Sequence, residues 1–234
     1  MARTSGRRAL DESLDLGSAS LVVLCGGGGA GTSGVLRAAA ASYAAGCGRA
    51  AIIFVGPWSR VSLPAGVPQA ALDRLFLMRV PDEGSLLAAA RAVSSMDLGF
   101  VALDDASHLS AVSRSAAPRS LMALAISRAV YRRGIQAMVA LLKGASGIIG
   151  YEYWWPFADL LVELEALQDG THRAASRLGE ARFRIFGGII MDARPGRGID
   201  ARPRTRGRPR RRRTTKSRSR LFRGNRPWRS STSL

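Results

Sequence analysis

Short apolar segments alternate with polar and glycine-rich segments over most of the chain. The apolar segments are continuous, which is typical of strands that are buried on both faces of a sheet. The predicted strands are residues 21–24, 51–55, 75–80, 100–103, 135–142, 157–164 and 181–186. Alanine-rich and other helix-favouring segments between them predict helices over residues 33–46, 84–95 and 118–133. This alternation predicts an α/β fold with a mostly parallel sheet and helices on both faces.

The pattern changes toward both ends of the chain. No helix is predicted between the strands over residues 157–164 and 181–186, so we expect these strands to form an antiparallel edge of the sheet. Residues 1–19 are polar and predict a flexible N-terminal arm, and the apolar periodicity ends near residue 192. The sequence therefore predicts a folded domain over residues 20–192 and a disordered tail over residues 193–234.

Charge is divided unevenly between the predicted domain and the predicted tail. The chain has a formal net charge of +18. Residues 194–234 contain sixteen Arg or Lys and one acid, Asp200, whereas the rest of the chain contains nineteen bases and sixteen acids. The tail is thus a polycation that follows a nearly neutral domain. Such a segment attracts polyanions, so we expect nucleic acid as a partner.

The most basic part of the tail, residues 206–213, is Arg-Gly-Arg-Pro-Arg-Arg-Arg-Arg. Its first four residues resemble the core of an AT-hook, which binds the minor groove of A·T-rich DNA, although an Arg-rich composition also produces such a tetrapeptide by chance. We expect DNA rather than RNA as the partner, but phosphate binding alone would accept both. A solvated tail without a defined partner is the alternative. The candidate nucleic-acid-binding residues are Arg206, Arg208, Arg210, Arg211, Arg212 and Arg213.

Several classes of protein are excluded by the rest of the composition. Cys25 and Cys47 are the only cysteines, which is too few for a disulfide framework or a cysteine-based metal site. No apolar run is long enough for a transmembrane helix, and acidic residues follow the basic start where a signal peptide would be apolar. His108 and His172 are isolated in the sequence. We therefore expect a cytoplasmic protein without a membrane partner, associated with the nucleoid if it binds DNA.

A glycine-rich segment lies between the first predicted strand and the first predicted helix. Residues 26–33 are Gly-Gly-Gly-Gly-Ala-Gly-Thr-Ser, which matches the P-loop pattern G-x-x-x-x-G-K-[ST] except at the lysine. Gly26, Gly29 and Gly31 belong to the turn, Ser33 has the hydroxyl position, and Thr32 replaces the lysine. Backbone amides and the helix N-terminus would still attract phosphate, but the ammonium group that reaches the β- and γ-phosphates is lost. We expect ATP or ADP with Mg²⁺ to bind weakly or not at all; a turn without any ligand is the alternative.

An acidic residue ends the fourth predicted strand. Residues 100–103 are apolar and are followed by Asp104, the pattern of a Walker B strand whose carboxylate holds the magnesium shell. Ser33 and Asp104 are therefore the candidate magnesium ligands. An acid that only caps a turn is the alternative interpretation. The complete candidate nucleotide site is Gly26, Gly29, Gly31, Thr32, Ser33 and Asp104.

The order of these motifs resembles the RecA/RadA recombinase superfamily, including its archaeal RadA paralogues, over roughly residues 15–190. Residues 157–165 resemble a family strand of the pattern A-D-x-x-x-x-L-E, and residues 181–186 resemble its basic hairpin partner. The resemblance implies a RecA-like P-loop NTPase fold and a role in DNA recombination or DNA repair. The family also has a catalytic glutamate after its second strand, where this chain has Trp58. With both the lysine and the glutamate missing, the resemblance implies a protein that does not hydrolyse ATP.

Three functions remain open at this stage. The first is a non-catalytic RecA/RadA paralogue that binds DNA and assists or regulates recombination, through self-association or an active RecA/RadA-type recombinase. The second is an unorthodox ATPase in which an arginine replaces the missing lysine. The third is a scaffold that binds DNA or RNA and is unrelated to recombination.

Aromatic residues are densest at residues 151–156, Tyr-Glu-Tyr-Trp-Trp-Pro. Such a cluster can stack on nucleobases, contact a protein partner or pack over the edge of the sheet. We expect packing.

Overall fold

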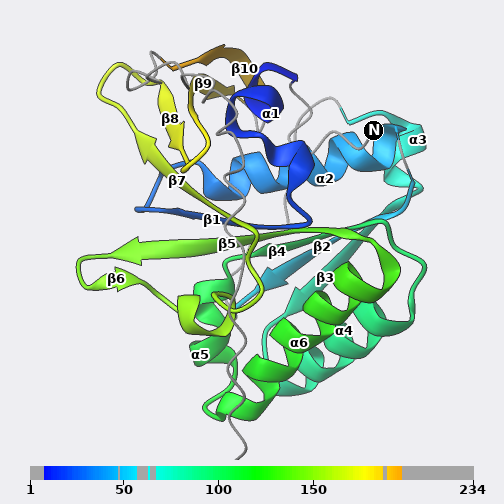
Figure 1. Cartoon of the computed structure of the whole chain (residues 1–234). Helices are drawn as coiled ribbons and strands as arrows, with labels where there is room; N and C mark the ends of the chain where they lie inside the picture. Colours follow the sequence, from blue (N-terminus) through cyan, green and yellow to red (C-terminus); the bar gives the residue numbers. More distant parts are fainter. Residues whose placement is uncertain (1–7, 47, 57–62, 64–66, 187–188, 197–234) are drawn as a thin grey trace, which may run out of the picture. The chain divides into compact units, whose positions relative to one another are not determined.

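A mixed β-sheet forms the centre of the computed structural model, which describes residues 8–46, 48–56, 63, 67–186 and 189–196. The strands are β1 (Leu21–Gly26), β2 (Ala50–Val55), β3 (Leu75–Val80), β4 (Phe100–Asp104), β5 (Gln136–Gly144), β6 (Gly147–Ile148), β7 (Leu160–Ala166), β8 (His172–Ala175), β9 (Glu180–Phe186) and β10 (Ile189–Pro195). Their order across the sheet is β10-β9-β8-β7-β1-β5-β4-β2-β3, and β6 pairs with β5 (Figure 1).

The middle of the sheet is parallel, as the uninterrupted apolar segments predict. β1 pairs in parallel with β5 and β7, and β2 pairs in parallel with β3 and β4. Every residue of β1, β2 and β4 is buried. Strands covered on both faces need apolar side chains at consecutive positions, which explains why these segments show no alternation of apolar and polar residues.

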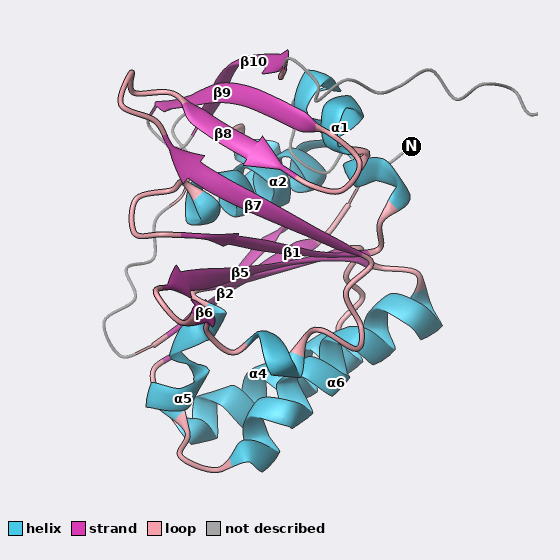
Figure 2. Ribbon diagram, turned by 60° about the vertical axis from the view of Figure 1, so that its left-hand side comes forward, coloured by secondary structure: helices cyan, strands magenta, loops and turns pink. Residues whose placement is uncertain are grey.

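Helices cover both faces of the sheet, and the predicted α/β class with a mostly parallel sheet is confirmed. The helices are α1 (Arg8–Leu14), α2 (Thr32–Gly46), α3 (Gln69–Leu72), α4 (Glu83–Ser95), α5 (Leu109–Val112) and α6 (Ala116–Arg133), with 3-10 turns η1 (Leu16–Ser18), η2 (Ala106–His108) and η3 (Tyr151–Tyr153). α1, α2 and α3 lie on one side of the sheet, and α4, α5 and α6 lie on the other (Figures 1 and 2). Each side has its own cluster of buried apolar side chains.

Local sequence signals fix the ends of the longer helices. Asp82 accepts a hydrogen bond from the backbone N–H of Ser85 at 2.8 Å and caps the N-terminus of α4. Gly134 follows α6 with φ +67°, the left-handed conformation that glycine adopts at the C-terminal end of a helix. Within the described residues, no helix has both the length and the hydrophobicity that crossing a membrane requires.

The antiparallel edge of the sheet is larger than the sequence predicts. The strands expected over residues 157–164 and 181–186 are β7 and β9, but they do not pair with each other. β8 lies between them and is antiparallel to both. β10 adds a further antiparallel strand beside β9 and extends to Pro195, beyond the boundary expected at residue 192. Several solvent-facing positions of the added strands are polar, among them Arg173, Asp192 and Arg194, because one face of this part of the sheet is open to solvent.

Residues 8–18 do not belong to a flexible arm, contrary to our expectation for residues 1–19. They form α1 and η1, in which Leu10, Leu14 and Leu16 are buried in the same apolar cluster as α2. α1 packs on β9 and β10. The i, i+4 spacing of Leu10 and Leu14 places both side chains on one face of the helix. Burial of this face against the sheet stabilises the short helix. Residues 1–7 lie outside the described residues.

Candidate functional site

The glycine-rich turn connects β1 to α2, as the sequence predicts. β1 ends at Gly26 and α2 begins at Thr32. Within the turn, the backbone N–H of Ala30 donates to the carbonyl oxygen of Gly27 at 3.0 Å. Gly29 and Gly31 have φ values of +79° and +89°, in the left-handed region that other residues adopt only with strain. The chain therefore needs glycine at these two positions to make this turn.

Close packing also restricts two glycines of the turn. A Cβ atom at Gly26 would lie 2.5 Å from the Cβ of Ala30 and 2.6 Å from the backbone oxygen of Leu164. A Cβ atom at Gly31 would lie 2.5 Å from the Cδ1 of Ile185. At the other three glycines of the turn, Gly27, Gly28 and Gly29, a Cβ atom would meet nothing within 4 Å. One side of the turn is thus packed against the antiparallel strands, and the other side is open.

Asp104 and Ser33 meet at the carboxyl edge of the sheet, although 71 residues separate them in the chain. β4 is the next strand but one to β1, so the end of β4 lies near the start of α2. The Ser33 hydroxyl donates to Asp104 Oδ1 at 2.6 Å. Asp104 is completely buried. The structure therefore brings together the two residues that the sequence selected as candidate magnesium ligands.

Arg37 is the third member of this cluster, and sequence reasoning missed it. Its Nε donates to Asp104 Oδ2 at 2.8 Å, and its Nη2 lies 2.7 Å from the same oxygen. The guanidinium carbon also lies 5.3 Å from the centre of the Phe54 ring, within the range of a cation–π contact. Ser33 and Arg37 are one turn apart on α2, and this spacing is the only sequence signal that relates them.

The Ser33–Asp104–Arg37 cluster does not fit a magnesium ion in its present geometry. The Ser33 hydroxyl uses its proton on Asp104, and the guanidinium group supplies the positive charge next to the carboxylate. A magnesium ion would have to displace an ion pair whose carboxylate is fully buried, and breaking such a pair is costly. Arg37 thus has the electrostatic role beside Asp104 that a cation would have.

Asp105 follows the cluster in an unusual conformation. Its φ of +57° lies in the left-handed region, and it precedes η2. Burial raises the pKa of the Asp105 carboxyl group above its ordinary value, and the negative charge of Asp104 raises it further. The two neighbouring carboxylates at the end of β4 therefore differ in environment: Asp104 forms an ion pair with Arg37, whereas the charges of His108 and Arg37 only partly offset the raised pKa of Asp105.

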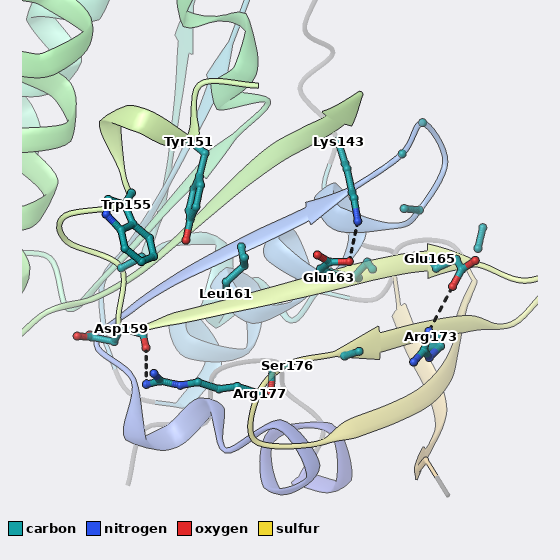
Figure 3. Close-up of a pocket in the computed structure, with 17 residues that line it drawn as sticks. Lys143, Tyr151, Trp155, Asp159, Leu161, Glu163, Glu165, Arg173, Ser176 and Arg177 are labelled. Carbon is teal, nitrogen blue, oxygen red and sulfur yellow. Dashed lines mark hydrogen bonds and ion pairs between the residues drawn. The ribbon is translucent and has the colours of Figure 1, made fainter. Parts of the chain in front are cut away.

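A cavity of about 850 Å³ lies on the open side of the glycine-rich turn. Gly27, Gly28 and Ala30 line one end, and β7 and β8 form its floor (Figure 3). Ser33 and Asp104 are not among the lining residues, so the candidate nucleotide site is divided between the cavity and the buried cluster. The remaining lining residues are Lys143, Tyr151, Trp155, Ala158, Asp159, Leu161, Glu163, Leu164, Glu165, Ala166, Arg173, Ala175, Ser176 and Arg177.

Ion pairs cross the floor of this cavity. Lys143 Nζ lies 2.8 Å from Glu163 Oε2, and Arg173 lies 3.6 Å from Glu165 (Figure 3). Arg173 also lies 3.0 Å from Glu180. The hydrogen bond to Glu163 raises the pKa of Lys143, and the hydrogen bond from Arg173 lowers the pKa of Glu180. Because four of these five side chains are more than one-third exposed, the pairs add little stability, and they leave the cavity nearly neutral in charge.

The aromatic segment divides between core packing and cavity lining. Trp154 is completely buried in the cluster beneath α4 and α6, which confirms the packing that we expected for part of the segment. Trp155 is 68% exposed and borders the cavity, where its ring meets the Tyr151 ring edge-on at 5.9 Å. A large exposed indole beside a cavity is available for stacking on a planar ligand.

The remaining candidate residues are placed as follows. Cys25 is buried in β1, and burial, together with the charge of Glu163, raises the pKa of its thiol to about 11, so it is not an activated nucleophile. His172 packs against the glycine-rich turn, with Nδ1 3.1 Å from the Ala30 carbonyl oxygen. Trp58, at the expected position of the glutamate, and the tail arginines between residues 206 and 213 lie outside the described residues.

Comparisons with known proteins add no family to these observations. No protein-family model matches the chain, and no curated protein sequence matches it significantly.

Proposed function

We propose that this chain is a non-catalytic paralogue of the RecA/RadA recombinase superfamily that binds DNA and assists or regulates recombination or repair. The observation that carries the proposal is the ion pair between Arg37 and the fully buried Asp104. The chain has the strand–turn–helix arrangement and the Ser33–Asp104 contact that a P-loop NTPase would have. In this chain, however, the side chain of Arg37 supplies the positive charge next to the carboxylate. The proposal thus explains both the preserved geometry and the altered chemistry.

We expect no catalysis because of three side chains, those of Thr32, Arg37 and Asp104. Thr32 occupies the lysine position of the motif and has no charge to stabilise a transferring phosphoryl group. Arg37 is the nearest arginine along α2, and its guanidinium group is bound to Asp104 rather than directed at a phosphate. This geometry disfavours an ATPase in which an arginine replaces the lysine. ATP or ADP would then bind weakly or not at all.

Binding to DNA is proposed from the sequence of the tail. The arginines between residues 206 and 213 would release counterions from the phosphate backbone, so the affinity would fall steeply with salt. Association with DNA would place the protein in the cytoplasm, at the nucleoid. A partner recombinase of the same superfamily, or a second copy of this chain, is the expected protein contact.

The proposal is tested by strand exchange between DNA molecules, catalysed by an active RecA/RadA-type recombinase. We expect the full-length chain to change the rate of exchange without turning over ATP itself. A matched full-length variant, with serine at Arg206, Arg208, Arg210, Arg211, Arg212 and Arg213, should lose most of this effect because its tail no longer binds phosphates. An unchanged rate of exchange together with tight binding to RNA or DNA would contradict the proposal and favour a nucleic-acid-binding scaffold.

A further inference from the structure

The registers of the antiparallel strands place basic side chains in one row across the sheet. Glu165 of β7 lies opposite Arg173 of β8, Arg173 lies opposite Arg182 of β9, and Arg182 lies opposite Arg194 of β10. Arg184 is two residues from Arg182 on β9, so it points to the same face. We call Arg182, Arg184 and Arg194 the arginine row.

The arginine row lies on the open face of the sheet. All three side chains are exposed, whereas the intervening residues Ala181 and Phe183 are buried in the apolar cluster that contains α2. Figure 2 shows β8, β9 and β10 beside α1 and α2 and away from α4 and α6, which cover the other face only under the parallel strands. A ligand can therefore approach the row directly.

No close ion pair neutralises the charges of the row among the described residues. Arg173 is neutralised by Glu165 and Glu180, but none of the three row arginines has a carboxylate within 4.0 Å among the described residues. Like charges directly opposite each other on adjacent strands destabilise a sheet. Arg182 and Arg194 form such a pair. An anion bound between them would remove this repulsion.

Two acids, Glu180 and Asp169, respond to the charges of the row. The hydrogen bond from Arg173 lowers the pKa of Glu180 most, and the charge of Arg182 lowers it further. Asp169 is the second of these acids. Its carboxylate accepts hydrogen bonds from Thr171, which lower its pKa most, while Arg182 and Arg184 lower it through their charges at longer range. This carboxylate is thus committed to its own turn and does not neutralise the row. Asp192, at φ +52°, lies within the bulge of β10 between Met191 and Arg194 and is exposed.

We propose that the arginine row binds the phosphodiester backbone of single-stranded nucleic acid, as a site separate from the tail. Adjacent strands hold Arg182 and Arg194 about 5 Å apart, close enough for two guanidinium groups to hold one phosphate. Phe186 lies on the same face of β9 and is 77% exposed, which suits stacking on an unpaired base. The site deepens the proposed function and rests on its nucleic-acid binding.

The position of the row in the sequence supports the same partner. β10 ends at Pro195, and the Arg-rich segment follows directly in the chain. A nucleic acid held by the tail would be tethered near the end of β10, which raises its effective concentration at the row. The two sites would then act on one strand.

Salt-dependent binding of single-stranded DNA and RNA oligonucleotides tests the row. The measurements use the full-length chain carrying the tail variant defined above, so that the tail contributes little. Row variant R182S/R184S/R194S is compared with control variant R91S/R128S/R132S, whose exposed arginines on α4 and α6 give the same change in net charge. Circular dichroism and thermal melting verify that both variants fold.

We expect the row variant to lose at least tenfold in affinity. The slope of log K against log salt should fall by about 1.4, since Arg182 and Arg194 share one phosphate, Arg184 contacts a second, and each phosphate contact contributes about 0.7. The affinity of the control variant should fall less than about threefold, because its substituted arginines are distant from the row and affect binding only through long-range electrostatics. Equal losses of affinity in the two variants would overturn the proposal for the arginine row but not the proposal that the tail binds nucleic acid. No binding by the unaltered chain would overturn the nucleic-acid part of the proposed function as well.

Protection from an arginine-modifying reagent provides a test that requires no substitution. We expect a single-stranded oligonucleotide to protect Arg182, Arg184 and Arg194 of the unaltered chain at least threefold, as mapped by mass spectrometry. Arg91 and Arg128 should react equally with and without the oligonucleotide. Modification of the row at an unchanged rate in the presence of saturating oligonucleotide would overturn the proposal.

Discussion

At the scale of single residues, the buried carboxylate of Asp104 determines what the site can bind. A carboxylate with no exposed surface is stable only if it is paired and hydrogen-bonded. Arg37 and Ser33 meet both requirements from one face of α2. The cluster is therefore complete without a ligand, which separates this chain from a P-loop NTPase that relies on a bound cation.

Replacing Arg37 by methionine should strongly destabilise the fold. Arg37→Met keeps most of the apolar stem but leaves Asp104 buried without its cation, so we expect the free energy of unfolding to fall by about 3 kcal/mol. The measurement is equilibrium unfolding in denaturant. Arg128→Met, at an exposed position of α6, should change the same quantity by less than about 0.5 kcal/mol. Equal effects of the two substitutions would show that Asp104 does not depend on Arg37.

The pairing of Ser33 with Asp104 could be predicted from the sequence, but the role of Arg37 could not. Asp104 ends one apolar segment, and Ser33 follows another one after the glycine-rich turn. The carboxyl ends of parallel strands lie at one edge of the sheet, which brings two such residues together. The position of Arg37 on α2 shows only which helix face it shares with Ser33. Which strand end lies under that face depends on the strand order, and local sequence does not encode the strand order.

At the scale of elements, the turn between β1 and α2 has one packed side and one open side. This asymmetry makes different predictions for neighbouring glycines. Gly26→Ala forces a Cβ atom into contact with Ala30 and the backbone of Leu164, so we expect a loss of about 2 kcal/mol in the free energy of unfolding. Gly27→Ala meets nothing and should cost less than about 0.5 kcal/mol. A larger loss for Gly27→Ala in thermal or denaturant unfolding would contradict the packing described for this turn.

The two adjacent tryptophans after η3 should also differ in their effects. Trp154→Ala removes a fully buried ring and should lower the free energy of unfolding by about 4 kcal/mol. Trp155→Ala should change stability little but weaken binding of single-stranded DNA about tenfold, because the exposed ring is available for base stacking. Denaturant unfolding and fluorescence anisotropy of a labelled oligonucleotide measure the two effects. Unchanged DNA affinity in Trp155→Ala would restrict this residue to lining the cavity.

The long elements of the fold could be predicted, and the short polar ones could not. The parallel strands and α2, α4 and α6 have continuous apolar or helix-favouring sequences, and the structure confirms them. β8 contains His172 and Arg173 and has only four residues, so its apolar pattern is too short to detect. α1 was missed because its two buried leucines become meaningful only when β9 and β10 are in place. Pairing partners, rather than local propensity, specify these elements.

At the scale of the whole molecule, the described unit has two kinds of surface with separate roles. One edge of the parallel sheet holds the glycine-rich turn and the self-contained Ser33–Asp104–Arg37 cluster. The antiparallel strands present an open face with the cavity and the arginine row. These two surfaces support the proposal that the chain binds nucleic acid without turning over ATP.

The most direct test of this account is steady-state turnover of Mg-ATP by the full-length chain, with and without DNA. We predict a rate indistinguishable from background, and the same rate for Asp104→Ala, because Thr32 carries no charge and Arg37 is paired with Asp104 rather than directed at a phosphoryl group. A rate clearly above background that disappears in Asp104→Ala would contradict the account and show that the site is an active ATPase.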